Sequence, residues 1–131
     1  MSTDALFTEA FPILVTPDLS RALGFYRDVC GATLSYQFPP DGDPDYVGLE
    51  LGSSHIGIAL DPAVAAGGPV AARPGSAAEL CVYTADCDAT VERLRAAGAP
   101  VIDEPADQPW GERMARVADP DGNQLLIMMK L

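Results

Sequence analysis

The sequence predicts an α+β fold of two tandem βαβββ modules, whose curved mixed sheets form a pocket. The first observation behind this prediction is an internal repeat, because Thr16 and Asp18 recur 68 positions later as Thr84 and Asp86. The second is the order of elements, since each half of the chain has the pattern of a strand, a helix and three further strands. This shared order is harder to obtain by chance than a few matching residues.

Module one is expected at about residues 9–62 and starts with a strand over residues 11–15. Asp18 can cap the helix that follows, in which apolar residues recur at steps of three and four positions. Gly31 is placed to end this helix.

The rest of module one has the pattern of three strands separated by turn-forming residues. In the first of them, alternation places Leu34, Tyr36 and Phe38 on one face of the sheet. The expected strands cover residues 33–38, 46–51 and 55–60.

A connector rich in Ala, Gly and Pro is expected at about residues 63–77, and module two at about 78–131. In module two, Asp86 can cap a second helix, which Gly98 ends. The Asp-Pro-Asp-Gly-Asn sequence at 119–123 is a strong turn signal. The expected strands of module two are 79–84, one at Val101, 114–118 and 124–129.

Composition narrows the class of protein and its partners. A chain of 131 residues suits a single domain, and no run of 18 apolar residues indicates a membrane span. The N-terminus lacks the pattern of a secretory signal. A net charge of −11 repels phosphate backbones and anionic membranes, so we expect neither nucleic acid nor membrane as a partner.

The cysteines indicate a reducing compartment. There are three of them, an odd number without CxxC spacing, which does not suggest a disulfide framework or a zinc site. We therefore expect a cytoplasmic protein.

Several segments together resemble the vicinal oxygen chelate superfamily, which includes glyoxalase I, bleomycin-resistance proteins, fosfomycin-resistance enzymes and extradiol dioxygenases. With the repeat, they cover nearly the whole chain. The resemblance implies paired βαβββ modules, usually in a homodimer, but the fold hosts many unrelated reactions. The segments are Leu14-Val-Thr-Pro-Asp-Leu-Ser-Arg-Ala-Leu-Gly-Phe-Tyr26, Leu49-Glu-Leu-Gly52, Pro109-Trp-Gly111 and Asp119-Pro-Asp-Gly-Asn123.

The resemblance also implies where metal-dependent members bind a divalent cation. The four matching positions here are Phe11, Gly57, Glu79 and Leu126. Only Glu79 offers a donor atom, and apolar side chains oppose the desolvation of a cation. We therefore expect no metal and no cofactor, and the chain is closest in kind to the metal-free bleomycin-resistance-like members.

The remaining candidate residues would serve an organic ligand. Trp110, Phe11, Tyr36 and Phe38 can supply stacking surface, although Trp110 could instead anchor a core or an interface. His55, the only histidine, lies two positions before Gly57 and can face the same cavity, or be an ordinary strand residue. The expected ligand-binding residues are Phe11, Tyr36, Phe38, His55, Gly57, Glu79, Trp110 and Leu126.

Three functions are open on these grounds. The first is metal-independent binding of a small organic molecule, with an aromatic or cationic antibiotic-like ligand. The second is a metal-dependent lyase, isomerase, dioxygenase or thiol transferase of the same superfamily. The third is a metal-free enzyme in which Glu79 or His55 acts as general base. The catalytic residues, if any, are not identified by the sequence.

Overall fold

The computed structural model describes residues 11–61 and 79–131, so the expected connector at 63–77 lies outside the described residues. The chain divides into two compact units, and each is described here by itself. The first unit comprises the described residues up to Leu19 and those from Gly31 to Asp61; the second comprises Ser20–Cys30 and the described residues from 79 onward. The second unit thus includes the helical segment Ser20–Cys30, which the sequence pattern counts in module one.

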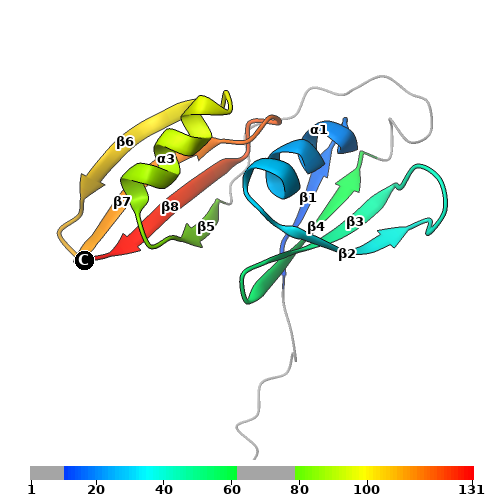
Figure 1. The fold of residues 1–131 in the computed structure, drawn as a ribbon, viewed down its shortest axis with the longest axis horizontal. Helices are drawn as coiled ribbons and strands as arrows, with labels where there is room; N and C mark the ends of the chain where they lie inside the picture. The colour runs from blue at the N-terminus through cyan, green and yellow to red at the C-terminus, as the bar shows by residue number, and fades with distance from the viewer. Residues whose placement is uncertain (1–10, 62–78) are drawn as a thin grey trace, which may run out of the picture. The chain divides into compact units, whose positions relative to one another are not determined.

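The first unit contains a four-stranded mixed sheet, sheet A, in the order β1-β4-β3-β2. Strand β1 pairs with β4 in parallel, and the other two pairings are antiparallel. β1 begins two residues later than the sequence pattern suggested. The strands are β1 (Ile13–Thr16), β2 (Thr33–Phe38), β3 (Tyr46–Leu51) and β4 (Ser54–Leu60) (Figure 1).

The two faces of sheet A differ because the residues of β3 and β4 alternate. Val47 pairs with Ile58 and Leu49 with Ile56, and these four side chains are almost completely buried. They form the buried face of the sheet. The intervening residues, including Tyr46, point to the opposite side.

A bulge in β2 corrects one expectation about this sheet. The register shifts at Ser35, so that Leu34 lies opposite Leu49 whereas Tyr36 lies opposite Gly48. Because directly paired residues share a face, Leu34 and Tyr36 point to opposite sides. The prediction that Leu34, Tyr36 and Phe38 share one face is therefore wrong for Leu34.

The second unit contains sheet B, in the order β5-β8-β7-β6, which repeats the order of sheet A. Again the first strand pairs with the last in parallel and the other pairings are antiparallel. The predicted α+β fold of two similar mixed sheets is therefore confirmed. The strands are β5 (Leu80–Tyr83), β6 (Val101–Asp107), β7 (Glu112–Ala118) and β8 (Gln124–Lys130).

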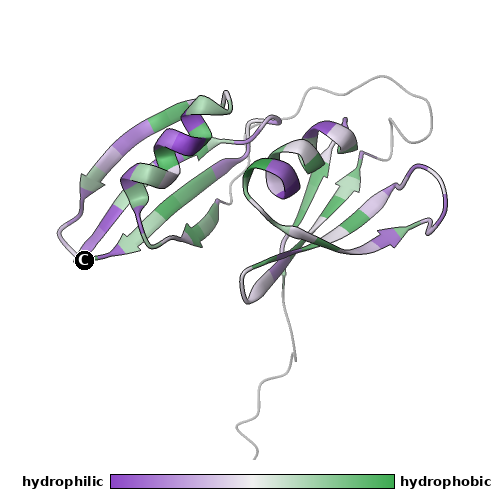
Figure 2. Cartoon of the chain, in the orientation of Figure 1, coloured by the Kyte–Doolittle hydropathy of each residue, from purple (hydrophilic) through white to green (hydrophobic). Residues whose placement is uncertain are grey.

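Helix α3 (Cys87–Ala96) packs against β6, β7 and β8 (Figure 1). Its buried residues are Cys87, Val91 and Leu94, on one stripe of the helix. The carboxylate of Asp86 caps the helix by accepting a hydrogen bond from the Ala89 backbone N–H at 3.0 Å, as predicted. Hydrophobic residues predominate on β5 and β8, while α3 mixes hydrophobic and hydrophilic positions (Figure 2).

The helix that follows β1 changes its winding part-way. A short α-helix, α1 (Leu19–Leu23), continues as a π-helix over Gly24–Val29, and the Cys30 N–H donates to the Phe25 carbonyl. The buried Tyr26 lies on the π-helical part, where its hydroxyl donates to the carboxylate of Asp119 in the β7–β8 turn.

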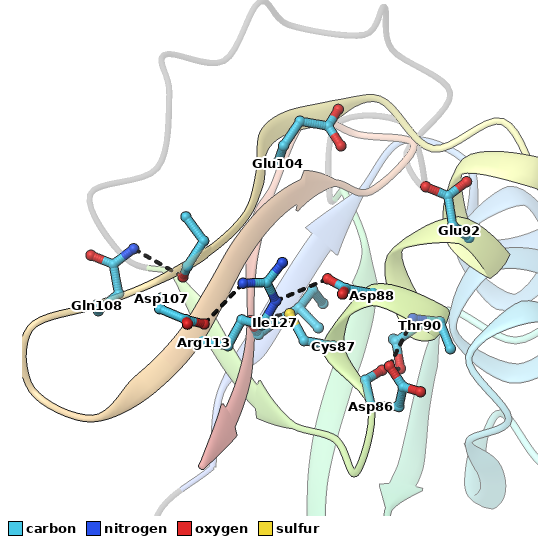
Figure 3. Close-up of polar contacts among 12 residues, drawn as sticks. Asp86, Cys87, Asp88, Thr90, Glu92, Glu104, Asp107, Gln108, Arg113 and Ile127 are labelled. Atoms are coloured by element: carbon cyan, nitrogen blue, oxygen red, sulfur yellow. Dashed lines mark hydrogen bonds and ion pairs between the residues drawn. The ribbon is translucent and has the colours of Figure 1, made fainter. Parts of the chain in front are cut away.

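Three arginines bind the carboxylates of β6 within the second unit. Arg113 Nη1 lies 2.9 Å from Asp107, and its Nε lies 3.0 Å from Asp88 of α3 (Figure 3). Arg95 of α3 donates to Glu104 of the same strand at 3.0 Å. The third, Arg116 of β7, belongs to the site described next. None of the helices in the described residues has the length and hydropathy needed to cross a membrane.

Candidate functional site

Sheet A presents an aromatic surface on the side opposite its buried face. Within this face, Tyr36 lies opposite Gly48, and Phe38 lies opposite Tyr46. Phe11 precedes β1 and packs against His55 of β4. We call this side the aromatic face, and its residues are Phe11, Ile13, Tyr36, Phe38, Tyr46, Gly48, Glu50, His55 and Gly57.

The large side chains of the aromatic face are exposed to an unusual degree. Phe11 is 42% exposed, and Ile13, Tyr36 and Phe38 are each more than half exposed. Single exposed apolar residues are ordinary on protein surfaces, but a group on one sheet face marks an interaction site. Three predicted ligand-binding residues, Phe11, Tyr36 and Phe38, are thus brought together on one surface.

A pair of glycines lies at the centre of this face. Gly57 of β4 pairs with Gly48 of β3, and Ile13 and Tyr36 continue the row on either side. A Cβ atom on Gly57 would come within 2.9 Å of the Tyr46 ring carbons Cε1 and Cζ and would collide with its hydroxyl oxygen. The Tyr46 ring therefore lies directly over Gly57, in space that any larger residue would fill.

The next row of the aromatic face carries its polar groups. His55 lies opposite Glu50 on β3 and contacts the Phe11 ring, with a centroid separation of 4.4 Å and an interplanar angle of 44°. His55 and Gly57 are two residues apart on one strand and so share a face, as expected. The carboxylate of Glu50 adds negative charge beside this aromatic pair.

The corresponding side of sheet B has different chemistry. Here Cys81, Leu126, Arg116 and Asp103 form the row that corresponds to Ile13, Gly57, Gly48 and Tyr36 in sheet A. A charged arginine thus occupies the place of a glycine.

Arg116 connects two carboxylates across this side of sheet B. Its Nε lies 2.8 Å from Glu79 and its Nη1 lies 2.8 Å from Asp103. These two hydrogen bonds hold the pKa of Arg116 above its already high ordinary value. Burial, followed by the negative charges of Glu112 and Glu79, raises the pKa of the neighbouring Cys81 thiol, which favours its neutral form.

The four positions at which the superfamily resemblance places a divalent cation do not fit one. Phe11, Gly57 and Leu126 have no side-chain donor atom, and the carboxylate of Glu79 is bonded to Arg116. Among residues 11–61 and 79–131, no three or more His, Cys, Asp or Glu side chains are grouped so as to hold a metal ion.

Trp110 lies in the second unit, in the turn between β6 and β7, and is 59% exposed. The Gly111 N–H donates to the Gln108 carbonyl, and the positive φ of Gly111 (93°) suits this tight turn. Trp110 is therefore not a core residue of its unit. Glu79 and Leu126 belong to the same unit as Trp110, whereas the five predicted residues of the aromatic face belong to the first unit.

Two residues of these surfaces were missed by sequence reasoning. Tyr46 was recognised only as the start of a strand, and Arg116 only as part of a hairpin. The period-two pattern Tyr46-Gly48-Glu50 could have indicated the first, because it alternates with the apolar Val47 and Leu49. No local pattern pairs Arg116 with Glu79, which lies 37 positions away.

The sequence of the chain matches the model of one known protein family. The model of the Glyoxalase/Bleomycin resistance protein/Dioxygenase superfamily matches residues 8–127. The chain belongs to this superfamily. Its two similar mixed sheets are those expected from the resemblance noted in the sequence.

Curated relatives of this superfamily member include "Putative glyoxylase CFP32" of Mycobacterium bovis and of Mycobacterium tuberculosis. Each is 38% identical over 108 residues, which are 81% of this chain. The chain spans only 37% of the length of these relatives.

Solved structures of the superfamily share the fold. TioX from Micromonospora sp. ML1 is 24% identical with a TM-score of 0.74, covering 95% of this chain and 100% of its own. TnmS3 from Streptomyces sp. CB03234, described as an antibiotic binding protein, is 26% identical with a TM-score of 0.70. That match covers 98% of this chain and 100% of TnmS3.

Proposed function

We propose that this superfamily member is a metal-independent binding protein that holds a small aromatic or cationic, antibiotic-like molecule against the aromatic face. The observation that carries the proposal is the exposure of Phe11, Tyr36 and Phe38 on one side of sheet A. Flat apolar rings on a rigid sheet can stack on a planar ligand and lose little conformational freedom in doing so.

Charge favours a cationic ligand over an anionic one. The chain carries a net charge of −11, and Glu50 lies on the aromatic face itself. A ligand cation placed over the faces of the tyrosine rings is also attracted by their quadrupoles. The description of TnmS3 as an antibiotic binding protein supports a ligand of this kind.

A second candidate is an enzyme of the superfamily, favoured by the name glyoxylase given to the mycobacterial relatives. A metal-dependent enzyme would need donors that three of the four expected positions lack. A metal-free enzyme would need Glu79 or His55 as general base. Arg116 Nε lies 2.8 Å from the carboxylate of Glu79, so this ion pair would have to break before Glu79 could accept a proton from a substrate.

Ligand titration tests the binding proposal. We expect bleomycin or a planar aromatic cation such as 9-aminoacridine to raise the melting temperature and to give a saturable isotherm in calorimetry. Phe38→Ala should weaken that binding roughly tenfold, because it removes one exposed ring. The matched control is Tyr83→Ala, an equally exposed ring on sheet B (59%). Equal loss in both variants would contradict the assignment to the aromatic face.

Elemental analysis separates the binding proposal from the metal-dependent enzyme. The protein, purified without chelators or added metal, should contain far less than one divalent ion per chain. Stoichiometric Ni, Zn, Mn or Fe that disappears in Glu79→Ala would overturn the metal-independent proposal.

We further propose a cytoplasmic homodimer. All three cysteines are free, which suits a reducing compartment. Sedimentation equilibrium of the purified chain tests the dimer, and a monomer at micromolar concentration would contradict it.

A further inference from the structure

Tyr46 differs from the other rings of the aromatic face in how it is held. Its ring lies over Gly57, and Tyr36 stands against it at a steep angle, with centroids 6.0 Å apart and an interplanar angle of 62°. Tyr36 is 55% exposed, whereas Tyr46 is half-buried. Tyr46 thus forms the floor of the face, and Tyr36 rises beside it.

The hydroxyl of Tyr46 has no hydrogen-bond partner within the described part of the chain. Every buried side-chain nitrogen or oxygen there does have a partner, so the Tyr46 hydroxyl reaches solvent. A ligand stacked on this floor would displace the water around that hydroxyl. Leaving a polar group without a partner is costly, so a ligand that can hydrogen-bond to it is favoured over one that cannot.

We infer that Tyr46 determines ligand specificity, by selecting planar aromatic molecules that carry a hydrogen-bonding nitrogen or oxygen. The inference rests on the proposed binding function and deepens it. Gly57 contributes by leaving space for the ring, and the Tyr36 ring beside it limits where the ligand can lie. Gly57 thus leaves room for the Tyr46 ring. At the matching position, the superfamily resemblance implies a metal-ligating residue in metal-dependent members.

The test uses two planar monocations of similar size. In 9-aminoacridine, the amino group and the protonated ring nitrogen both offer N–H donors, whereas 10-methylacridinium offers none. The measured quantity is the ratio of their two dissociation constants, which cancels the general contribution of stacking and charge. We compare the wild type, Tyr46→Phe and, as a matched control, Tyr36→Phe.

We expect the wild type to prefer 9-aminoacridine, and Tyr46→Phe to reduce this preference roughly 3- to 10-fold, the worth of one hydrogen bond. Tyr36→Phe should keep the wild-type ratio, and Tyr46→Phe should melt like the wild type. An unchanged ratio in Tyr46→Phe, with both probes bound, overturns the role of Tyr46 and leaves the binding function intact. A wild-type protein that binds neither probe overturns the inference together with the proposed function.

Discussion

The hydroxyl of Tyr26 donates a hydrogen bond to the carboxylate of Asp119 at 2.7 Å, and both residues are almost completely buried. Asp119 also accepts hydrogen bonds from the backbone N–H groups of Asp121 and Asn123 and from the Asn123 side chain. The Asp-Pro-Asp-Gly-Asn turn is thus organised around one buried carboxylate, which Tyr26 connects to the π-helix.

Removing the Tyr26 hydroxyl should destabilise the second unit. We expect Tyr26→Phe to lower the free energy of unfolding by about 1–3 kcal/mol, because a buried carboxylate loses one donor. Urea denaturation at neutral pH measures the change. Tyr83→Phe is the control, since Tyr83 is exposed, and a loss of equal size there would contradict the explanation.

The contact between Tyr26 and Asp119 should also make the stability of the protein depend on pH in the alkaline range. Burial and the charge of Asp119 raise the pKa of Tyr26 above its ordinary value of 10.0. Above about pH 10 the unfolded chain loses the Tyr26 proton while the folded chain keeps it. The contribution of the Tyr26 hydroxyl to the free energy of unfolding therefore falls as pH rises. The stability gap between wild type and Tyr26→Phe should therefore narrow above about pH 10. A gap that stays constant would show that Tyr26 does not titrate differently on folding.

Replacing Arg116 should expose a repulsion between carboxylates. In Arg116→Met, Glu79 and Asp103 lose the guanidinium that joins them, and we expect a loss of about 0.5–1 kcal/mol at low salt. Added salt should shrink the deficit, because it screens like charges. Thermal melts at two salt concentrations give the result, with Arg116→Lys as a variant that keeps the charge. A deficit that grows with salt would contradict this reading.

The close approach of Tyr46 to Gly57 predicts a coupled pair. Gly57→Ala should destabilise the first unit by about 1–3 kcal/mol, because the new methyl group overlaps the Tyr46 ring. In Gly48→Ala the nearest atom is Tyr36 Cβ at 3.3 Å, and a smaller effect is expected.

A double-mutant cycle checks the physical cause. When Tyr46 is already alanine, the methyl group of Gly57→Ala meets no ring, and the substitution should cost clearly less. Additive losses in the cycle would show that the ring is not the source of the strain.

The repeat made the topology of both sheets predictable. The repeated Thr-x-Asp pattern, Thr16 with Asp18 and Thr84 with Asp86, marks the same point in each half. Strand β1 ends at Thr16, and β5 ends at Tyr83, one residue before Thr84. The Asp86 cap was likewise predictable, because an Asp before an apolar helical stripe has a local reason to be there. Local signals of this kind need no knowledge of the rest of the chain.

The bulge at Ser35 could not be predicted in the same way. Alternation in β2 is a property of one strand, whereas the register depends on how Leu34 and Tyr36 meet β3. The π-helical segment containing Tyr26 could not be predicted from local sequence either, since the hydrogen-bond partner of Tyr26, Asp119, lies 93 positions away.

The candidate site was predicted in part. Phe11, Tyr36, Phe38, His55 and Gly57 do share one face; strand alternation and the superfamily resemblance had singled them out. The ion pair of Arg116 with Glu79 depends on side chains from separate strands, and the place of Tyr46 depends on the empty space over a glycine. The ion pair leaves no pattern along the sequence, and the alternation Tyr46-Gly48-Glu50 indicates only the face on which Tyr46 lies.

Strand β6 lies at the margin of sheet B and carries Asp103, Glu104 and Asp107, each held by an arginine of β7 or α3. An unprotected margin is a template on which further chains can add strands and grow into fibrils. Another β6 approaching this margin would have to displace water from these charged pairs, so edge-to-edge growth of the molecule is opposed here. Crowded solutions of the protein should for this reason resist amyloid formation through β6.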